Sequence, residues 1–90
     1  MESSTRARTL PPLDAKAIDD VRAMWKLTER QTAVAAQVAR GLSNKEVAAE
    51  LRCEESTVEK HLRGVFRKTG FQNRVALAVS VWITSRGSTV

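Results

Sequence analysis

The most informative residues of this sequence are the basic side chains that follow Glu59. All ten acidic residues lie at or before Glu59, whereas the rest of the chain carries six basic residues and no acid. The six are Lys60, Arg63, Arg67, Lys68, Arg74 and Arg86. Lysine and arginine bind phosphate oxygens and release the counterions condensed on a nucleic acid. The block therefore indicates a nucleic-acid surface, although a basic, well-solvated surface has the same composition.

The segment from Glu55 to about Thr69 is predicted to be a helix with two different sides. At about 100° per residue, its apolar side gathers the residues that would face a core: Val58, Leu62, Val65, Phe66 and Thr69. The opposite side carries Ser56, Lys60, Arg63 and Arg67, with Glu59 at its margin. The major groove of DNA admits such a helix. An ordinary surface helix also has a polar back, so the stripe alone leaves both interpretations open.

A short helix precedes this segment at the spacing of a helix-turn-helix. Ser43 and Glu46 form a capping box, in which each side chain satisfies a free backbone N–H at the helix start. The box opens a helix over residues 44–51, and three residues then separate it from the next helix. A short helix, a tight turn and a longer helix are typical of the helix-turn-helix, although other α-hairpins share this arrangement.

Two further helices are predicted around this pair. Thr28 and Gln31 form another capping box, and the helix that they open runs to Gly41, a residue type that suits the left-handed C-terminal position. Asn73 caps a last helix, which covers residues 74 to about 84. No alternating pattern typical of a strand appears in the sequence, so the predicted class is all-α.

The N-terminal segment is predicted to be an arm followed by a helix. Residues 1–12 are polar and end in two prolines, which is typical of a mobile arm. Residues 14–25 carry apolar side chains at helical spacing, and Asp14 suits the cap. This amphipathic helix would pack either on the main domain or on a partner. Residues 85–90 are predicted to be a C-terminal tail.

Composition excludes several other classes of protein. Ninety residues suit one small domain, and a single cysteine excludes a disulfide framework and a cysteine-rich zinc site. The one histidine, His61, is accompanied by no positioned nucleophile, further metal ligands or phosphate-cradling glycine loop. We therefore expect no enzyme, no metal site and no cofactor. No apolar stretch approaches the roughly 20 residues of a membrane span, so we expect a cytoplasmic protein with no membrane partner.

Five sequence blocks in residues 27–79 resemble the LuxR/GerE/NarL-type DNA-binding domain. They are "LTER", "GLSNKEVAAEL", "STVEKHL", "FRKTG" and "NRVALAV", and they follow one another in the order and with the gaps of that family. The resemblance implies a domain over residues 27–84 with four helices, the third of which enters the major groove. The helix over residues 14–25 is additional to this fold. Family members are transcription regulators, so the resemblance implies double-stranded DNA as the partner.

The resemblance also implies roles for individual residues. Carried over by position, three residues would face base edges: Glu59, Lys60 and Arg63. Five would hold phosphates, the last being a weaker candidate: Asn44, Lys45, Thr57, Arg67 and Arg74. The usual dimer contact of the family is its last helix. We therefore expect a homodimer through residues 74–84, with RNA polymerase or a related regulator as further partners.

The last predicted helix is apolar on two sides, which bears on that dimer. Val75, Ala78, Val79 and Trp82 make one face, and Leu77 and Val81 lie on the other. Such a helix buries both sides or leaves an exposed patch. We predict that the side with Leu77 and Val81 meets a symmetry mate. Packing of that side under the N-terminal helix is the alternative.

The sequence departs from the family pattern at several positions. Arg52 stands where a turn glycine is usual, so the turn is expected to be strained or differently shaped. Glu59 stands where the family more often carries lysine, and we predict that it trades affinity for selectivity. Gly64 lies inside a predicted helix, at a cost of about 1 kcal/mol against alanine. It either allows a close approach of backbone or DNA, or is simply tolerated.

The segment before the motif leaves a second function open. Family members are often fused to a phosphoacceptor or ligand-binding domain, and 26 residues are too few for either. The chain would then be a stand-alone regulator, a fragment of a longer protein, or a small protein that pairs with a full-length relative. In the last case it would be an interaction protein that heterodimerises with a LuxR-type regulator and inhibits it.

Overall fold

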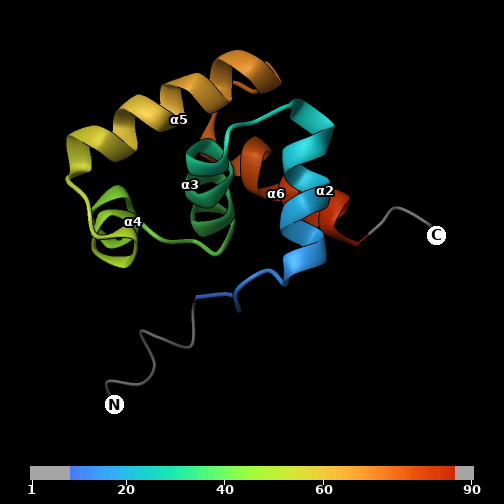
Figure 1. The fold of residues 1–90 in the computed structure, drawn as a ribbon, viewed down its shortest axis with the longest axis horizontal. Helices are drawn as coiled ribbons and strands as arrows, with labels where there is room; N and C mark the ends of the chain where they lie inside the picture. The colour runs from blue at the N-terminus through green and yellow to red at the C-terminus, as the bar shows by residue number, and fades with distance from the viewer. Residues whose placement is uncertain (1–8, 87–90) are drawn as a thin grey trace.

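Five helices and no strand form the part of the chain that the computed structural model describes, residues 9–86 (Figure 1). They are α2 (Ala15–Trp25), α3 (Glu29–Ala39), α4 (Asn44–Leu51), α5 (Glu55–Thr69) and α6 (Arg74–Ser85). The all-α prediction is confirmed, and each helix lies where the sequence predicts it. Residues 1–8 of the predicted arm and 87–90 of the predicted tail lie outside the described part.

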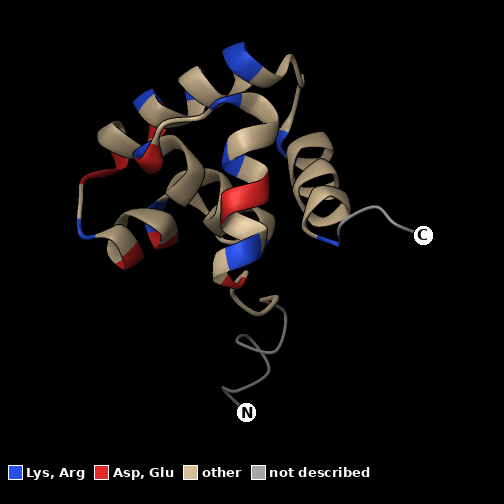
Figure 2. Cartoon of the chain, turned by 45° about the vertical axis from the view of Figure 1, so that its right-hand side comes forward, with Lys and Arg blue, Asp and Glu red and all other residues tan. Residues whose placement is uncertain are grey.

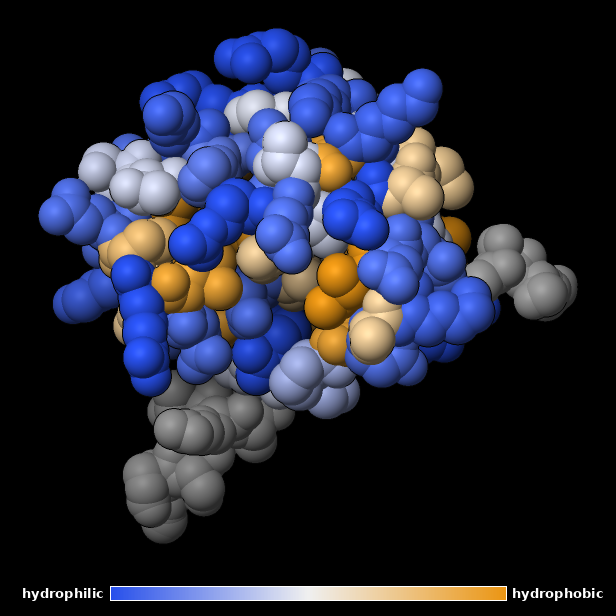
Figure 3. All heavy atoms as spheres, in the orientation of Figure 1, coloured by the Kyte–Doolittle hydropathy of each residue, from blue (hydrophilic) through white to orange (hydrophobic). Residues whose placement is uncertain are grey.

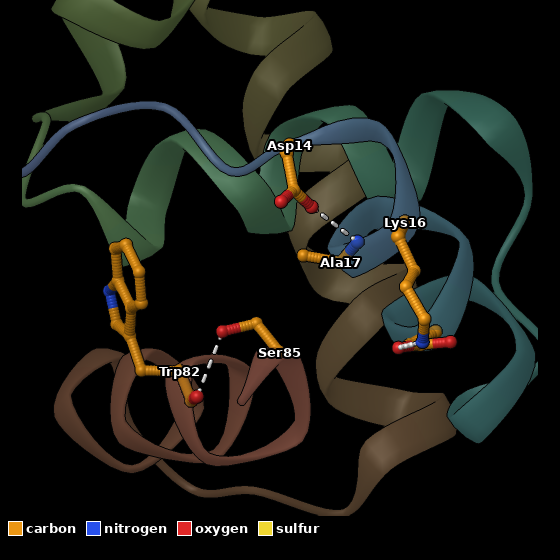
Figure 4. A network of polar contacts seen from close by, with 6 residues as sticks. Asp14, Lys16, Ala17, Trp82 and Ser85 are labelled. Carbon is orange, nitrogen blue, oxygen red and sulfur yellow. Dashed lines mark hydrogen bonds and ion pairs between the residues drawn. The ribbon is translucent and has the colours of Figure 1, made fainter. Parts of the chain in front are cut away.

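Four of the five described helices, α2, α3, α4 and α6, begin at the caps that the sequence predicts. The side chains of Thr28 and Gln31 complete a capping box on α3, as do those of Ser43 and Glu46 on α4. On α2, Asp14 Oδ1 accepts from the backbone N–H of Ala17 at 2.8 Å (Figure 4). On α6, the Asn73 side chain accepts from the N–H of Ala76. Each cap contributes about 1 kcal/mol, so local sequence fixes where these helices start.

Helix α3 lies at the centre of the fold and contacts each of the other four helices. The fully buried side chains of the core are mostly valines: Val21, Val34, Val47, Val58, Val65, Leu77 and Val81, together with Ala35. Such small side chains let the helices approach closely. The indole N–H of Trp82 donates to the carbonyl of Ala39 at 2.7 Å and ties α6 to the end of α3. This core holds α5 on the outside of the molecule, along the upper edge in Figure 1.

Helix α2 is part of this core. It contacts both α6 and α3, and Val21 is fully buried. Trp25 packs edge-on against Phe71, with ring centroids 5.7 Å apart, and Lys68 Nζ donates to the carbonyl of Lys26 at 3.0 Å. The sequence left open whether this helix packs on the main domain or on a partner, and in the structure it packs on the main domain.

The end of the N-terminal arm is held against the fold. The backbone N–H of Leu10 donates to the carbonyl of Arg40 at 3.0 Å, and Arg40 Nε donates back to the carbonyl of Leu10 at 2.8 Å. The sequence suggested a mobile arm through residue 12. Within its described part, this pair of hydrogen bonds holds the chain at Leu10, the residue directly before the two prolines.

Of the two outcomes that the sequence left open for α6, the structure shows the alternative, in which the side with Leu77 and Val81 packs under the N-terminal helix. Leu77 and Val81 are fully buried in the core of the single chain, so they are not on a surface that could meet a symmetry mate. The exposed apolar side chains of α6 are instead Val75, Val79 and Ile83. The reason is the additional helix: α2 packs on α6, and Leu77 and Val81 belong to the same buried cluster as Val21.

Candidate nucleic-acid interface

The turn between α4 and α5 sets the direction of the basic helix. Arg52 adopts the left-handed conformation, with φ 58° and ψ 49°, and its N–H bonds back to the end of α4. The N–H of Cys53 donates to the carbonyl of Ala48 at 3.0 Å. A residue with a Cβ is destabilised by about 1 kcal/mol in this left-handed region, whereas glycine is not. The strain predicted at Arg52 is therefore present, and the turn closes despite it.

The inner side of α5 anchors it to the rest of the fold. Val58, Leu62, Gly64 and Val65 are buried, while Phe66 is half-buried beside the core. The C-terminal end is closed by Gly70 at φ 80°. Glu54 and Glu55 lie at the cap and first turn, where the helix dipole favours negative charge, although Glu54 makes no side-chain cap bond. These two acids therefore lie at the start of the helix, where their charge is favourable, and not in the basic stripe.

The outer side of α5 is the exposed stripe that the sequence predicts. Ser56, Glu59, Lys60, Arg63 and Arg67 are all exposed. The ion pairs between described residues, Lys16–Asp20 and Arg22–Asp19, lie on α2, so no such pair engages the stripe. In the space-filling view the edge along α5 is hydrophilic (Figure 3). The stripe is thus available for a polyanion.

The acids of the helix pair all lie at or before Glu59, and the charged residues that follow it on α5 are all basic. In Figure 2 the acids gather on α4 and around the turn into α5, and blue segments follow along α5. Glu46 and Glu50 are exposed on α4, away from the basic end of α5. The exposed charges of α5 beyond Glu59 are therefore all positive.

Glu59 lies where α5 faces the start of α4. It lines a shallow groove together with Asn44, Leu62, Arg63 and Phe66. Three predicted contact residues from two helices, namely Asn44, Glu59 and Arg63, thus come together in one place. A carboxylate in a base-reading position accepts from the amino group of cytosine and repels phosphate.

The remaining predicted phosphate residues differ in how free their side chains are. Lys45 and Arg67 are exposed, and Thr57 is half-buried in the first turn of α5. The guanidinium of Arg74 is engaged inside the chain, because it donates to Asn44 Oδ1 and to the carbonyl of Leu42, both at 2.7 Å. The sequence did not predict the contact between Arg74 and Asn44, since these residues lie 30 positions apart in the chain.

Other kinds of site find no support in the described residues. They contain no group of three or more histidine, cysteine or acidic side chains that could hold a metal ion. None of their helices combines the length and the apolar character needed to cross a membrane. Cys53 is a free, half-buried cysteine that packs against the core.

Comparison with known proteins points to one group of regulators. The family model described as bacterial regulatory proteins, luxR family, matches residues 26–81. A nitrate/nitrite response regulator homolog of Haemophilus influenzae is 47% identical over 53 residues, which cover 59% of this chain and 26% of the relative. The nitrate/nitrite response regulator NarP of Escherichia coli is 40% identical over 62 residues, which cover 69% and 28%. No solved structure matches the chain.

One relative is similar over nearly the whole chain, α2 included. The monoamine regulon transcriptional regulator of Klebsiella aerogenes is 34% identical over 96 aligned positions, which cover 99% of this chain and 41% of the relative. The chain thus spans from about a quarter to two-fifths of the length of these three relatives.

Proposed function

Because the chain belongs to the luxR family of bacterial regulatory proteins, we propose that it binds double-stranded DNA sequence-specifically and regulates transcription. Helix α5 enters the major groove, whose width admits one helix. The observation that carries this proposal is the exposed, basic stripe of α5, on the second helix of a helix-turn-helix whose inner side is buried. The printed names of the relatives, which describe response or transcriptional regulators, support it.

The side chains on the outer face divide into two groups. Glu59, Lys60 and Arg63 read base edges, because lysine and arginine pair with guanine and a carboxylate accepts from cytosine. Lys45, Thr57 and Arg67 hold phosphates on either side and set the position of the helix. The half-buried Asn44 contributes from the start of α4.

The proposed regulator is a homodimer that uses the exposed side of α6. Val75, Val79 and Ile83 are 72%, 52% and 58% exposed and recur every fourth residue along one line of the helix. An apolar line of this kind on a small protein favours a protein contact. A two-fold dimer presents two copies of α5 to the two half-sites of a palindromic operator. This surface replaces Leu77 and Val81 as the dimer contact.

Selection of bound sequences from random duplex DNA by the 90-residue chain tests the proposal. We expect one enriched sequence with two related half-sites, because a dimer reads two. Affinity for the enriched duplex should fall by orders of magnitude between about 50 and 200 mM salt, since several phosphates are neutralised. No enrichment together with a flat salt response would overturn the proposal.

A second function uses the same face of α6. The chain would pair with a full-length relative and keep it from DNA, and the acidic Glu59 in the reading stripe favours this function because it weakens phosphate binding. A purified chain that is monomeric, binds no duplex and co-purifies with a larger luxR-type regulator would support it over the first.

A further inference from the structure

Arg74 links the first turn of α6 to the first turn of α4. Its guanidinium makes a fork: Nη1 donates to Asn44 Oδ1 and Nη2 donates to the carbonyl of Leu42, each at 2.7 Å. Both contacts are partly buried, and Arg74 itself is half-buried. A planar guanidinium with two fixed acceptors holds one orientation far better than a lysine ammonium does.

The bond from Arg74 occupies the oxygen of the Asn44 side-chain amide and leaves its NH2 group free to bind a ligand. The amide has one accepting oxygen and one NH2 group with two donors. Because the oxygen accepts from Arg74, the donating Nδ2 is turned away from the guanidinium. Asn44 also lines the groove beside Glu59 and Arg63, on the side of the molecule where the proposed function places DNA.

We propose that Arg74 is a positioning residue, which fixes the Asn44 amide so that Nδ2 donates to a DNA phosphate. This inference rests on the proposed function and reassigns Arg74, which the sequence suggested as a phosphate contact of its own. Nη1 and Nη2 of Arg74 donate within the chain, so Arg74 affects DNA binding through the orientation of Asn44. It also joins the first residue of the helix proposed for dimerisation to the helix that starts the DNA-binding pair.

The number of neutralised phosphates separates positioning from direct contact. The logarithm of affinity falls with the logarithm of salt concentration, and removing a cation that contacts a phosphate makes this fall less steep by about 0.9. Removing a neutral amide that donates to a phosphate lowers affinity without that change of slope. An arginine that acts only through Asn44 therefore behaves like the amide, although it carries a charge.

The test is a double-mutant cycle on the 90-residue chain with a short duplex that the wild-type chain has selected. We expect Asn44→Ala and Arg74→Ala each to weaken binding about tenfold, and the double variant to be no weaker than the weaker single variant. Both single variants should keep the wild-type salt slope. Lys45→Ala is the matched control, and the magnitude of its salt slope should be smaller than that of wild type by about 0.9.

Asn44→Asp separates the effect on DNA from an effect on stability. The new carboxylate still accepts from Arg74 and lies at the start of a helix, where a negative charge is favourable, so the Tm should rise. Its outer oxygen faces the phosphate and repels it. We therefore expect a chain that is more stable and binds DNA more than tenfold more weakly than wild type.

Three results would contradict the inference. Additive losses in the cycle, with a lower slope for Arg74→Ala, would make Arg74 a direct phosphate contact. Wild-type affinity of Arg74→Ala, measured where the variant is fully folded, would make its role structural only. If the wild-type chain showed no salt-dependent binding to any duplex, the proposed function would fail and this inference with it.

Discussion

Gly64 of α5 lies directly against the side chain of Gln31 in α3. A Cβ at Gly64 would collide with Gln31 Nε2 and come within 3.5 Å of Cδ. The same side chain completes the capping box of α3, because its Oε1 accepts from the N–H of Thr28 at 3.0 Å. Of the explanations that the sequence left open for this glycine, the structure supports a close approach between protein elements. Gly64 faces inward, away from the proposed DNA surface.

The effect of Gly64→Ala on stability should depend on Gln31. Alanine adds about 1 kcal/mol of helix propensity to α5, but in the wild-type chain it displaces the Gln31 cap, which is worth about 1 kcal/mol. In a Gln31→Ala background the collision is gone, so Gly64→Ala should stabilise by about 1 kcal/mol. Denaturant unfolding of the four chains measures this coupling. Equal effects of Gly64→Ala in both backgrounds would refute the link.

Arg52→Gly should stabilise the helix-turn-helix. Arg52 occupies the left-handed region at φ 58°, where glycine avoids a penalty of about 1 kcal/mol, so the free energy of unfolding should rise by up to that amount. Lys26 has nearly the same conformation, with φ 56°, at the end of α2, and Lys26→Gly is a matched comparison. Arg52→Ala keeps a Cβ and should be close to neutral. A glycine variant no more stable than the alanine variant would rule out strain at this turn.

Val79→Glu should weaken self-association and leave the folded chain intact. Val79 is half exposed on the apolar line of α6, so a charge there stays solvated in the monomer but is buried in the proposed dimer. Sedimentation across a range of concentrations measures the change. Leu77→Ala is the contrasting control, because it empties a fully buried site and should cost about 3 kcal/mol of stability. Unchanged association of Val79→Glu would place the dimer contact elsewhere.

Glu59→Lys should tighten binding to unrelated duplexes and blur the preferred site. The substitution replaces a repelled charge beside the phosphates with an attracted one, and it removes the acceptor proposed for cytosine. Glu59→Gln, which keeps the size without the charge, should lie between wild type and lysine. Affinities for the selected duplex and for a scrambled duplex give the comparison. Weaker binding of Glu59→Lys to both duplexes would show that the acid does not limit affinity.

The starts of the helices were predictable from sequence because caps are local. Thr28 with Gln31 and Ser43 with Glu46 need only three residues of spacing to find each other. The outward stripe of α5 was predictable for a similar reason, since one side of that helix is clearly apolar and the other clearly charged.

The roles of α6 and Arg74 depend on contacts between distant segments. Both sides of α6 are apolar, so its periodicity could not say which side α2 would cover, and Leu77 and Val81 were assigned to the wrong surface. The bond from Arg74 to Asn44 joins two helix starts that only the folded chain brings together. A polar side chain that is partly buried needs a hydrogen-bond partner, but the sequence does not say which residue will be that partner.

The central claim, that the outer stripe of α5 reads DNA sequence, is tested most directly at Arg63. The measurement is the binding free energy of wild type and Arg63→Ala for the selected duplex and for each of its single-base variants. We predict that Arg63→Ala loses about 1–3 kcal/mol on the selected duplex and no longer discriminates at one base pair, with its other preferences kept. An equal loss on every duplex, with all preferences intact, would contradict base reading by this stripe.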